Sequence, residues 1–313
     1  MHVLVLSGGL SAERDVSLRS GRRVAEALRQ DRPDWEVNEH DVDGGLLDAI
    51  ATDHPDCIVP LLHGAAGEDG ALRNVLESLG IPFVGSDAAA SRLAFDKPVA
   101  KRLVEDAGMT TPRCVALPSS IFRELGASAV LNHVVDHLGL PIVVKPTKSG
   151  SALGASVVHH AADLPAAMVG AFAYGDVVLM EQYVAGTEVS VCVFERDGDL
   201  LALSAVEIVP PGELYDYASR YTAGTTEFFC PARLSEEATL AAQALALDVH
   251  ALLDLRDWSR TDMIVDVDGQ ASFLEVNVAP GMTETSLFPQ ALHAADITLG
   301  ALTAALVEAA IAR

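Results

Sequence analysis

The sequence predicts an α/β protein built from more than one domain. Its 313 residues exceed the roughly 100–200 residues of a typical domain. Half of the residues are hydrophobic and 21% are charged, so the chain can bury a large core. Apolar runs of strand length alternate with segments of helical spacing, a pattern typical of folds in which helices pack on largely parallel sheets.

The first 86 residues form the first expected domain, with doubly wound α/β character. Residues 3–6 predict a strand that ends at Gly8 and Gly9, and residues 16–29 show helical spacing. This opening occurs in many doubly wound folds, although it is not a GxGxxG dinucleotide fingerprint. Further along, residues 57–62 predict a buried strand, residues 71–79 a helix and residues 81–84 a short strand.

Two further units are expected, over residues 87–180 and 181–313. In the central unit, an α+β unit, residues 87–108 show a helical pattern that Pro112 ends. Its predicted strands cover residues 141–146, 155–159 and 177–183. The C-terminal unit has predicted strands at 188–194, 201–209, 261–267 and 272–276, and predicted helices at 236–253 and 297–312.

Charge and composition exclude some classes of partner. The 21 Lys and Arg residues against 44 Asp and Glu residues leave a net charge of −23. Duplex nucleic acid is therefore not an expected partner, because phosphate binding requires a basic surface. The only lysines are Lys97, Lys101, Lys145 and Lys148. A local basic cleft for a small anion stays possible there, and Lys101, one helical turn after Lys97, is expected on a solvated face.

Cysteine usage and hydropathy indicate a cytoplasmic protein with no membrane partner. The four cysteines are far apart in the sequence, which fits neither a zinc site nor a disulfide framework. Reduced thiols in the cytoplasm are the expectation. The N-terminal apolar run is too short for a signal peptide, and no window approaches the about 20 apolar residues of a membrane span.

A small-residue loop at 147–154 is the first candidate for ligand binding. Its glycines allow close approach of a ligand, and successive N–H groups can surround an anion. It is not a Walker A loop, because no GK[ST] follows the glycines. An ordinary hairpin turn is the alternative. Lys145, at the end of an apolar strand, favours the functional interpretation, because a charge there must leave the core or pair with an anion.

A predicted hairpin near the C-terminus brings a second set of polar residues together. Residues two apart share one face of a strand, so Arg260 and Asp262 point one way, as do Glu275 and Asn277. Two carboxylates and an amide oxygen suit Mg²⁺ bridged to substrate phosphates. Spacing alone leaves a solvated edge hairpin with routine salt bridges equally open.

Four other segments are weaker candidates. Residues 277–287 contain a Pro-Gly turn whose N–H groups can face an oxyanion. Residues 215–221 hold three tyrosines, which is more typical of a lid or an interface than of a core. Residues 11–14 follow the first glycine turn, where a helix capping box is the simpler account. Residues 63–70 are glycine-rich and follow a strand, where open α/β sheets place ligands.

Taken in order, these segments resemble the D-alanine–D-alanine ligases, which are ATP-grasp carboxylate–amine ligases. The resemblance covers nearly the whole chain and rests on the motifs SAERDVSLRSG, HGAAGEDG, GSDAAASRLAFDK, VVKPTKSGSALGAS, MEQYVAGTEVSV, ELYDYASRYTAGTTEFFCPA, RTD and LEVNVAPGMTETSLFP. It implies three domains, with ATP between the central and C-terminal ones. It also implies ligation of two D-alanines through an acyl phosphate, for peptidoglycan precursor synthesis.

The resemblance also implies roles at the nucleotide and metal sites. Arg220 stands where the family usually has a lysine, and its phosphate contact is less secure because Arg is a planar fork. Asp262, Glu275 and Asn277 are implied to hold two Mg²⁺, or Mn²⁺. The implied ATP contacts are Lys97 and Lys145 to the phosphates, Glu181, Tyr183 and Val184 to the adenine, and Glu188 to the ribose.

Roles toward the amino acids follow in the same way. Arg260 and the Gly281 N–H are implied to stabilise the oxyanion. The remaining implied residues are Glu13 and His63 at the first D-alanine, Ser286 and Leu287 at the second, and Ser151 and Tyr221, which with Glu13 anchor a lid over about 213–225.

Two alternatives remain open from the sequence. The same chemistry could use another D-amino acid or a D-hydroxy acid as second substrate. Relatives that prefer D-lactate usually lack the lid tyrosine, so Tyr221 favours the dipeptide. A non-catalytic descendant is the other alternative, and the intact set of metal and lysine positions argues against it. The family also implies a homodimer.

Overall fold

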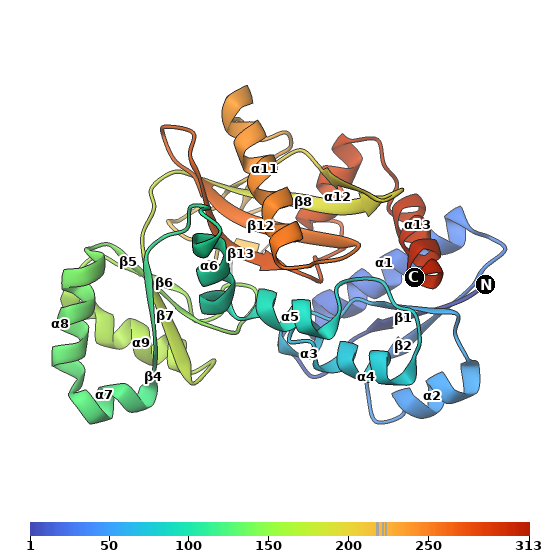
Figure 1. Cartoon of the computed structure of the whole chain (residues 1–313), viewed down its shortest axis with the longest axis horizontal. Helices are drawn as coiled ribbons and strands as arrows, with labels where there is room; N and C mark the ends of the chain where they lie inside the picture. The colour runs from blue at the N-terminus through green and yellow to red at the C-terminus, as the bar shows by residue number, and fades with distance from the viewer. Residues whose placement is uncertain (217–218, 221, 223) are drawn as a thin grey trace.

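The computed structural model describes residues 1–313 apart from 217, 218, 221 and 223. The described strands form three sheets, of three, six and four strands. In Figure 1 the three-stranded and four-stranded sheets lie toward opposite ends of the molecule, and the six-stranded sheet lies between them. Each sheet carries its own helices.

The first sheet is parallel, with the strand order β2–β1–β3. Its strands are β1 (His2–Ser7), β2 (Glu36–Asp41) and β3 (Cys57–Pro60), and the helices near it are α1 (Arg14–Asp31), α2 (Leu46–Asp53), α3 (Ala65–Glu68) and α4 (Ala71–Leu79). β1 is the central strand, which explains the uninterrupted apolar run that predicted it. Because parallel strands end at the same edge, the segments 8–13 and 63–70 meet there.

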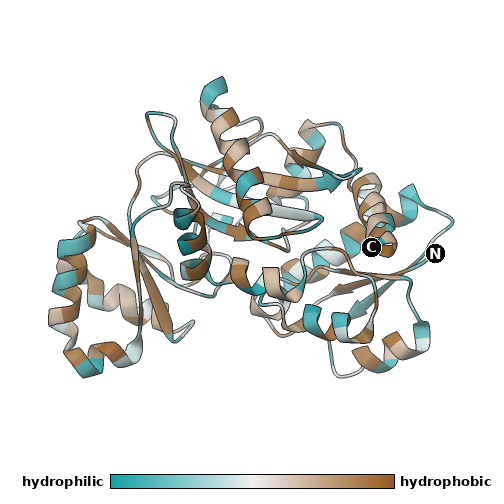
Figure 2. Ribbon diagram, in the orientation of Figure 1, coloured by the Kyte–Doolittle hydropathy of each residue, from teal (hydrophilic) through white to brown (hydrophobic). Residues whose placement is uncertain are grey.

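The second sheet is antiparallel, with the order β4–β7–β5–β6. Figure 2 shows long hydrophobic stretches in its strands. β4, α7 and α8 lie in a stretch, 113–140, for which the sequence pattern had suggested no element. The elements are β4 (Cys114–Pro118), α7 (Ser119–Leu125), α8 (Ala127–Leu138), β5 (Ile142–Pro146), β6 (Ser156–Val158), a 3₁₀ turn (Ala161–Asp163), α9 (Leu164–Phe172) and β7 (Val177–Gln182).

The third sheet has the order β11–β10–β8–β12–β13, with β9 paired to β8. Its elements are β8 (Thr187–Arg196), β9 (Asp199–Ala202), β10 (Val206–Val209), β11 (Glu227–Phe229), α11 (Glu236–Leu252), β12 (Trp258–Val265), β13 (Ala271–Asn277), α12 (Leu287–Ala294) and α13 (Leu299–Ala312). Val189, Val191 and Val193 of β8 pack in one cluster with α11. Cys192 and Phe194 pack in another with α12 and α13, so helices cover both faces of this sheet.

Three sequence predictions about elements are wrong in detail. Residues 81–84 form no strand, because only Phe83 pairs, in an isolated bridge with Ile58. The helix predicted over 87–108 is two helices, α5 (Ala88–Phe95) and α6 (Lys97–Asp106). The break fits Pro98, which belongs in the first turn of a helix rather than its interior. The strand predicted over 201–209 is interrupted between β9 and β10.

The main core joins the two ends of the chain. Val24 and Leu28 of α1 belong to the same buried cluster as Leu302 and Leu306 of α13. A second cluster joins Ala94 and other residues of α5 and α6 to the third sheet. The division of the chain into units 1–86, 87–180 and 181–313 stays a prediction.

No single helix in the described ranges has the length and apolar character of a membrane span. α12 and α13 reach the length and apolar character of a span only when they are taken together, and a bend of 103° separates the two helices.

Leu28→Ala should lower the free energy of unfolding by about 2–5 kcal/mol, because it removes a fully buried side chain at the α1–α13 contact. Urea denaturation measures this loss. Leu240→Ala is the matched control, since Leu240 is 60% exposed on α11, and its effect should stay within about 0.5 kcal/mol. Equal effects of the two substitutions would contradict a shared core.

Candidate active site

A cleft of about 840 Å³ lies between the second and third sheets. One wall comes from β5, β6, β7 and the loop 147–154, and the other from β8, β12 and β13. Apolar side chains from both walls face it, Val143 and Val157 on one side and Ile264 and Leu274 on the other. All the residues predicted to contact ATP line this cleft: Lys97, Lys145, Glu181, Tyr183, Val184, Glu188 and Arg220.

Two lysines share one buried carboxylate at the base of this cleft. Lys145 Nζ lies 2.5 Å from Glu181 Oε1, and Lys101 Nζ lies 2.9 Å from Glu181 Oε2. Burial raises the pKa of Glu181, but the two ammonium groups outweigh burial and hold the pKa below its ordinary value. For Lys145, burial lowers the pKa and Glu181 raises it, with a net upward shift. The lysines therefore hold Glu181 as an anion.

The expectation that Lys101 lies on a solvated face is wrong. Its side chain is 1% exposed and points toward Glu181. Burial lowers the pKa of Lys101 despite the attraction of Glu181. Helical spacing from Lys97 could not reveal this, because the partner carboxylate comes from β7, eighty residues later in the chain.

Lys97 connects the glycine loop to the third sheet. Its Nζ donates to the carbonyl oxygen of Ser149 at 2.7 Å and lies 3.1 Å from Glu275 Oε2. Burial opposes ionisation of Glu275, but Lys97 and Lys145 bring its pKa down to about 2. Lys148 is different, because its side chain is 58% exposed and pairs with Asp96.

The predicted hairpin between β12 and β13 is present. Arg260 pairs with Asn277 and Asp262 with Glu275 in the strand register. The Arg260 guanidinium donates to both carboxylate oxygens of Asp262 at 2.8 Å, and Ser190 Oγ donates to the same carboxylate. With its amide oriented to satisfy both ends, Asn277 accepts from Arg260 and donates to Glu68. All four hairpin side chains therefore lie on one face.

These residues also bear on metal binding. In the described part of the chain, no group of three or more His, Cys, Asp or Glu side chains could hold a metal by itself. Asp262, Glu275 and Asn277 offer only two carboxylates and an amide. Such a set fits a hard cation that keeps several non-protein oxygens, as Mg²⁺ does when it binds with phosphates.

A second, more polar cavity meets the cleft at Tyr215, Arg220 and Glu275, which line both. Glu13 and Ser151 both line it, and Ser151 Oγ donates a hydrogen bond to Glu13. Besides the shared Arg220 and Glu275, the predicted residues that line this cavity are Glu13, His63, Ser151, Arg260, Asn277, Gly281, Ser286 and Leu287. Tyr221, predicted to complete the set of Glu13 and Ser151, lies outside the described residues.

His63 holds two segments of the cavity wall together. Its Nδ1 donates to the carbonyl oxygen of Ala279 at 3.0 Å, which leaves Nε2 to accept from Ser20 Oγ at 3.2 Å. Ser20 Oγ in turn accepts from the Met282 N–H at 3.1 Å. Burial lowers the pKa of His63, so the ring is neutral in this arrangement.

The loop after β13 forms the floor of the cavity and leads into α12. Thr283 N–H donates to Ser286 Oγ at 3.0 Å, immediately before the helix begins at Leu287. A Cβ at Gly281 would lie 2.8 Å from Ser286 Oγ, so glycine allows this close turn. The N–H groups at the start of α12 make this end of the cavity suitable for a carboxylate.

Comparison with known proteins identifies the family. The family model described as D-ala D-ala ligase C-terminus matches residues 103–308. The D-alanine–D-alanine ligase of Nitrosospira multiformis is 40% identical over 95% of this chain and 92% of its own length. The ligase of Syntrophobacter fumaroxidans is 42% identical over 99% of this chain and 97% of its own length. The chain belongs to the D-alanine–D-alanine ligase family.

Solved structures extend the likeness to the fold. The D-alanine–D-alanine ligase of Bacillus anthracis complexed with ATP has a TM-score of 0.82 at 28% identity, covering 100% of this chain and 98% of its own. A D-Ala:D-Ser ligase from Enterococcus faecalis has a TM-score of 0.84 at 27% identity, covering 99% of both chains. The predicted ATP-grasp fold is thereby confirmed for this family member.

Glu68 and Tyr215 were assigned no individual role from the sequence, although they line the cavities of this ligase-family site. Glu68 is buried beside Asn277 and accepts from the Gly64 N–H at 2.7 Å. Burial, with a further contribution from Glu13, raises the pKa of Glu68 to about 8. The Arg220 guanidinium stacks on the Tyr215 ring, with Cζ 4.1 Å from the ring centroid. Two signals were available: the acidic residues of the glycine-rich segment 63–70, from which only the histidine was singled out, and the tyrosine-rich segment 215–221.

Lys101→Met should lower the free energy of unfolding by about 3–5 kcal/mol, because breaking a buried pair leaves Glu181 poorly compensated. Thermal or urea unfolding provides the measurement. Lys148→Met is the control, since Lys148 is largely exposed, and its effect should be at most about 1 kcal/mol. If the two variants are equally stable, the buried pair contributes nothing and the assignment of Lys101 is wrong.

Proposed function

We propose that the chain is an ATP-dependent ligase that joins two D-alanines into D-alanyl-D-alanine, for peptidoglycan precursor synthesis. The observation that carries this is the meeting of two cavities at the β12–β13 hairpin. One cavity holds lysines suited to a nucleotide, and the other holds charges of both signs suited to amino acids. Family membership supports the same reaction.

ATP is proposed to bind in the cleft between the second and third sheets. Lys97 and Lys145 contact the phosphates, and Arg220 adds a third cation beside them. The adenine lies against Glu181, Tyr183 and Val184, and the ribose hydroxyls face Glu188. Support comes from the apolar walls of the cleft and from the three cations that line it in an otherwise acidic chain.

Asp262, Glu275 and Asn277 would hold the two Mg²⁺ ions, or Mn²⁺, that accompany the nucleotide. Their oxygen ligands suit a hard cation, and Asp262 and Glu275 pair across adjacent strands. The bound cation would neutralise charge on the transferring phosphoryl group. In the structure, Arg260 and Lys97 compensate these carboxylates.

The amino acids are proposed to react in the second cavity. The carboxylate of the first D-alanine, held beside Glu13 and His63, attacks the γ-phosphate and forms an acyl phosphate while ADP leaves. The amine of the second D-alanine attacks the acyl carbon, and the tetrahedral intermediate expels phosphate. Ser286 and Leu287, at the start of α12, receive the carboxylate of the second D-alanine.

Arg260 and the Gly281 N–H are proposed to stabilise the oxyanion of that intermediate. Arg260 is suited to this role because its charge is permanent and its position is set by two hydrogen bonds to Asp262. The segment 213–225 would act as the lid, anchored through Glu13, Ser151 and Tyr221. Closure is needed because water hydrolyses an acyl phosphate.

The proposal also includes a homodimer in the cytoplasm, as the family resemblance implies. Light scattering of the purified protein would test the dimer, since a monomeric mass at working concentration would contradict it.

The reaction is tested by phosphate release from Mg-ATP with D-alanine alone and with D-alanine paired with D-serine or D-lactate. We expect turnover with D-alanine alone, and none when the metal is chelated. Turnover only with a mixed pair would mean that the second substrate is D-serine or D-lactate instead of D-alanine. No turnover under any condition would reject ligase activity.

Arg260→Ala should reduce kcat by at least about 10²-fold, the usual cost of one oxyanion donor. Steady-state phosphate release measures the change. Arg233→Ala is a matched control, because the Arg233 side chain is 58% exposed, pairs with Glu207 and lines neither cavity. Near-parental turnover of Arg260→Ala would remove Arg260 from the oxyanion site.

A further inference from the structure

Arg73 on α4 is a buried charged side chain that the reaction described above does not use. It is 1% exposed, and within the described residues its three hydrogen bonds all go to backbone carbonyl oxygens. Burial lowers the pKa of Arg73 to about 10, so the guanidinium is still charged at neutral pH. Burying a charge is costly, which calls for a reason beyond stability.

The three carbonyls belong to three separate segments of the chain. Arg73 Nη1 donates to Gly67 at 2.7 Å, Nε donates to Ser86 at 2.7 Å, and Nη2 donates to Val278 at 3.4 Å. Gly67 lies in the segment 63–70, which carries His63 and Glu68. Val278 lies in the loop that carries Asn277 and Gly281. One guanidinium therefore bridges two walls of the amino-acid cavity.

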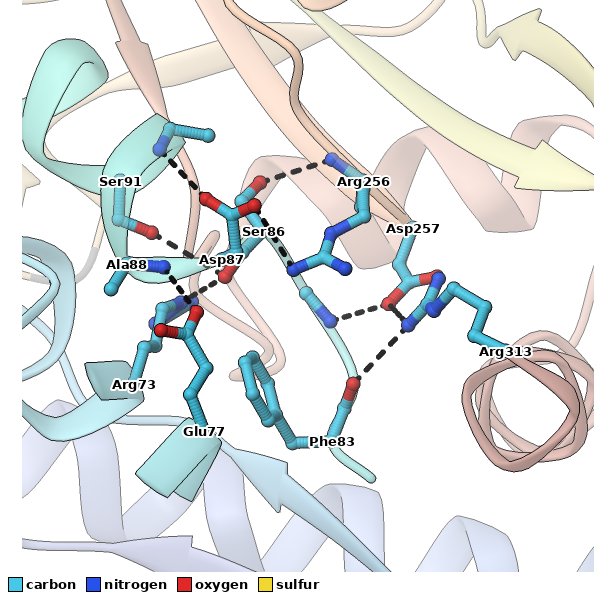
Figure 3. Close-up of polar contacts among 12 residues, drawn as sticks. Arg73, Glu77, Phe83, Ser86, Asp87, Ala88, Ser91, Arg256, Asp257 and Arg313 are labelled. Carbon is cyan, nitrogen blue, oxygen red and sulfur yellow. Dashed lines mark hydrogen bonds and ion pairs between the residues drawn. The ribbon is translucent and has the colours of Figure 1, made fainter. Parts of the chain in front are cut away.

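The third partner, Ser86, belongs to a segment that is itself held firmly. Figure 3 shows Phe83, Ser86 and Asp87 of this segment among side chains from α4, from the turn before β12 and from Arg313, which follows α13. Asp257 accepts from the Gly85 N–H at 2.5 Å, and the Arg313 guanidinium pairs with both oxygens of Asp257. The Arg256 N–H donates to Ser86 Oγ at 3.1 Å.

This segment thus ties Arg73 to the start of β12. Asp257 directly precedes that strand, and Arg260 and Asp262 follow three and five residues later. The Arg73 guanidinium consequently links three parts of the site to one another. These are the histidine segment, the loop after β13 and the strand that carries the oxyanion arginine.

We propose that Arg73 is a positioning residue of the amino-acid cavity, which sets the spacing between the segment 63–70 and the loop 277–281. The inference rests on the proposed function, because it concerns how D-alanine is held. Arginine is required because its planar fork reaches three acceptors at once, whereas a lysine ammonium is a single point. The nucleotide cleft is built from the other two sheets, and Arg73 does not line it.

Arg73→Lys and Arg73→Gln test this inference by separating the two substrates. Because a misplacement of about 1 Å can cost about 10²-fold in rate, we expect kcat/KM for D-alanine to fall at least about tenfold in both variants. KM for ATP should stay within about twofold of the parent. Phosphate release is measured first with D-alanine varied at saturating ATP, and then with ATP varied at saturating D-alanine.

Arg313→Gln is the matched control within the same contact region. It removes the partner of buried Asp257 and should lower the thermal midpoint, yet Arg313 touches neither wall of the cavity. Its KM values for D-alanine and ATP should equal those of the parent, because the Gly85–Asp257 and Arg256–Ser86 hydrogen bonds do not involve Arg313 and still hold the segment 83–87. A general loosening of this region would instead alter both Arg73 and Arg313 variants in the same way.

Four outcomes would overturn the inference. One is parental D-alanine kinetics in a folded Arg73 variant, and another is an equal rise in KM for ATP. A D-alanine defect in Arg313→Gln matching that of the Arg73 variants is the third. Failure of both Arg73 variants to fold, judged by circular dichroism, is the fourth, because Arg73 would then serve the fold alone. Absence of D-alanine turnover in the parent protein would reject the proposed function instead.

Discussion

The register between β12 and β13 is the constraint on which the rest of the site depends. Arg260 opposes Asn277 and Asp262 opposes Glu275, so one guanidinium, two carboxylates and one amide gather on a single face. A slip of one residue would turn these side chains to the opposite face, which packs against α11. That apolar face therefore enforces the register. Both cavities meet at this hairpin, so one strand pairing shapes the proposed nucleotide site and the proposed amino-acid site together.

Several buried charges near the cleft between the second and third sheets form groups of opposite sign. Lys97 pairs with Glu275, Lys101 and Lys145 share Glu181, and Arg260 pairs with Asp262. Three of the four lysines in the sequence are thus committed to the cleft between the sheets. Because each of these side chains has a partner of opposite sign, the cleft can hold cations suited to a polyanion inside a protein of net charge −23. The negative net charge of the protein therefore does not prevent a local group of cations in the cleft.

Much of the fold follows from local patterns, and the exceptions have physical reasons. β1 and the β12–β13 hairpin were predictable because burial on both faces, or alternation around a tight turn, leaves a strong signal. β2 escaped prediction because it is a polar edge strand, EVNEHD, with little apolar content. Residues 81–84 looked like a strand, but only Phe83 pairs with its neighbour. Pairing of that kind depends on what lies alongside, and a single segment cannot specify it.

The sequence by itself determined the family, the order of its motifs and the residue types available for phosphate, metal and amino-acid binding. Lys145, Asp262, Glu275 and Arg260 were identifiable because their motifs are contiguous and short. Tertiary structure alone decided which charges are buried and which groups they face. Lys101 meets Glu181 across eighty residues, and Arg73 meets Val278 across two hundred and five. Such contacts arise when elements distant in sequence pack together, so the environment of a side chain is a property of the whole fold rather than of its neighbours along the chain.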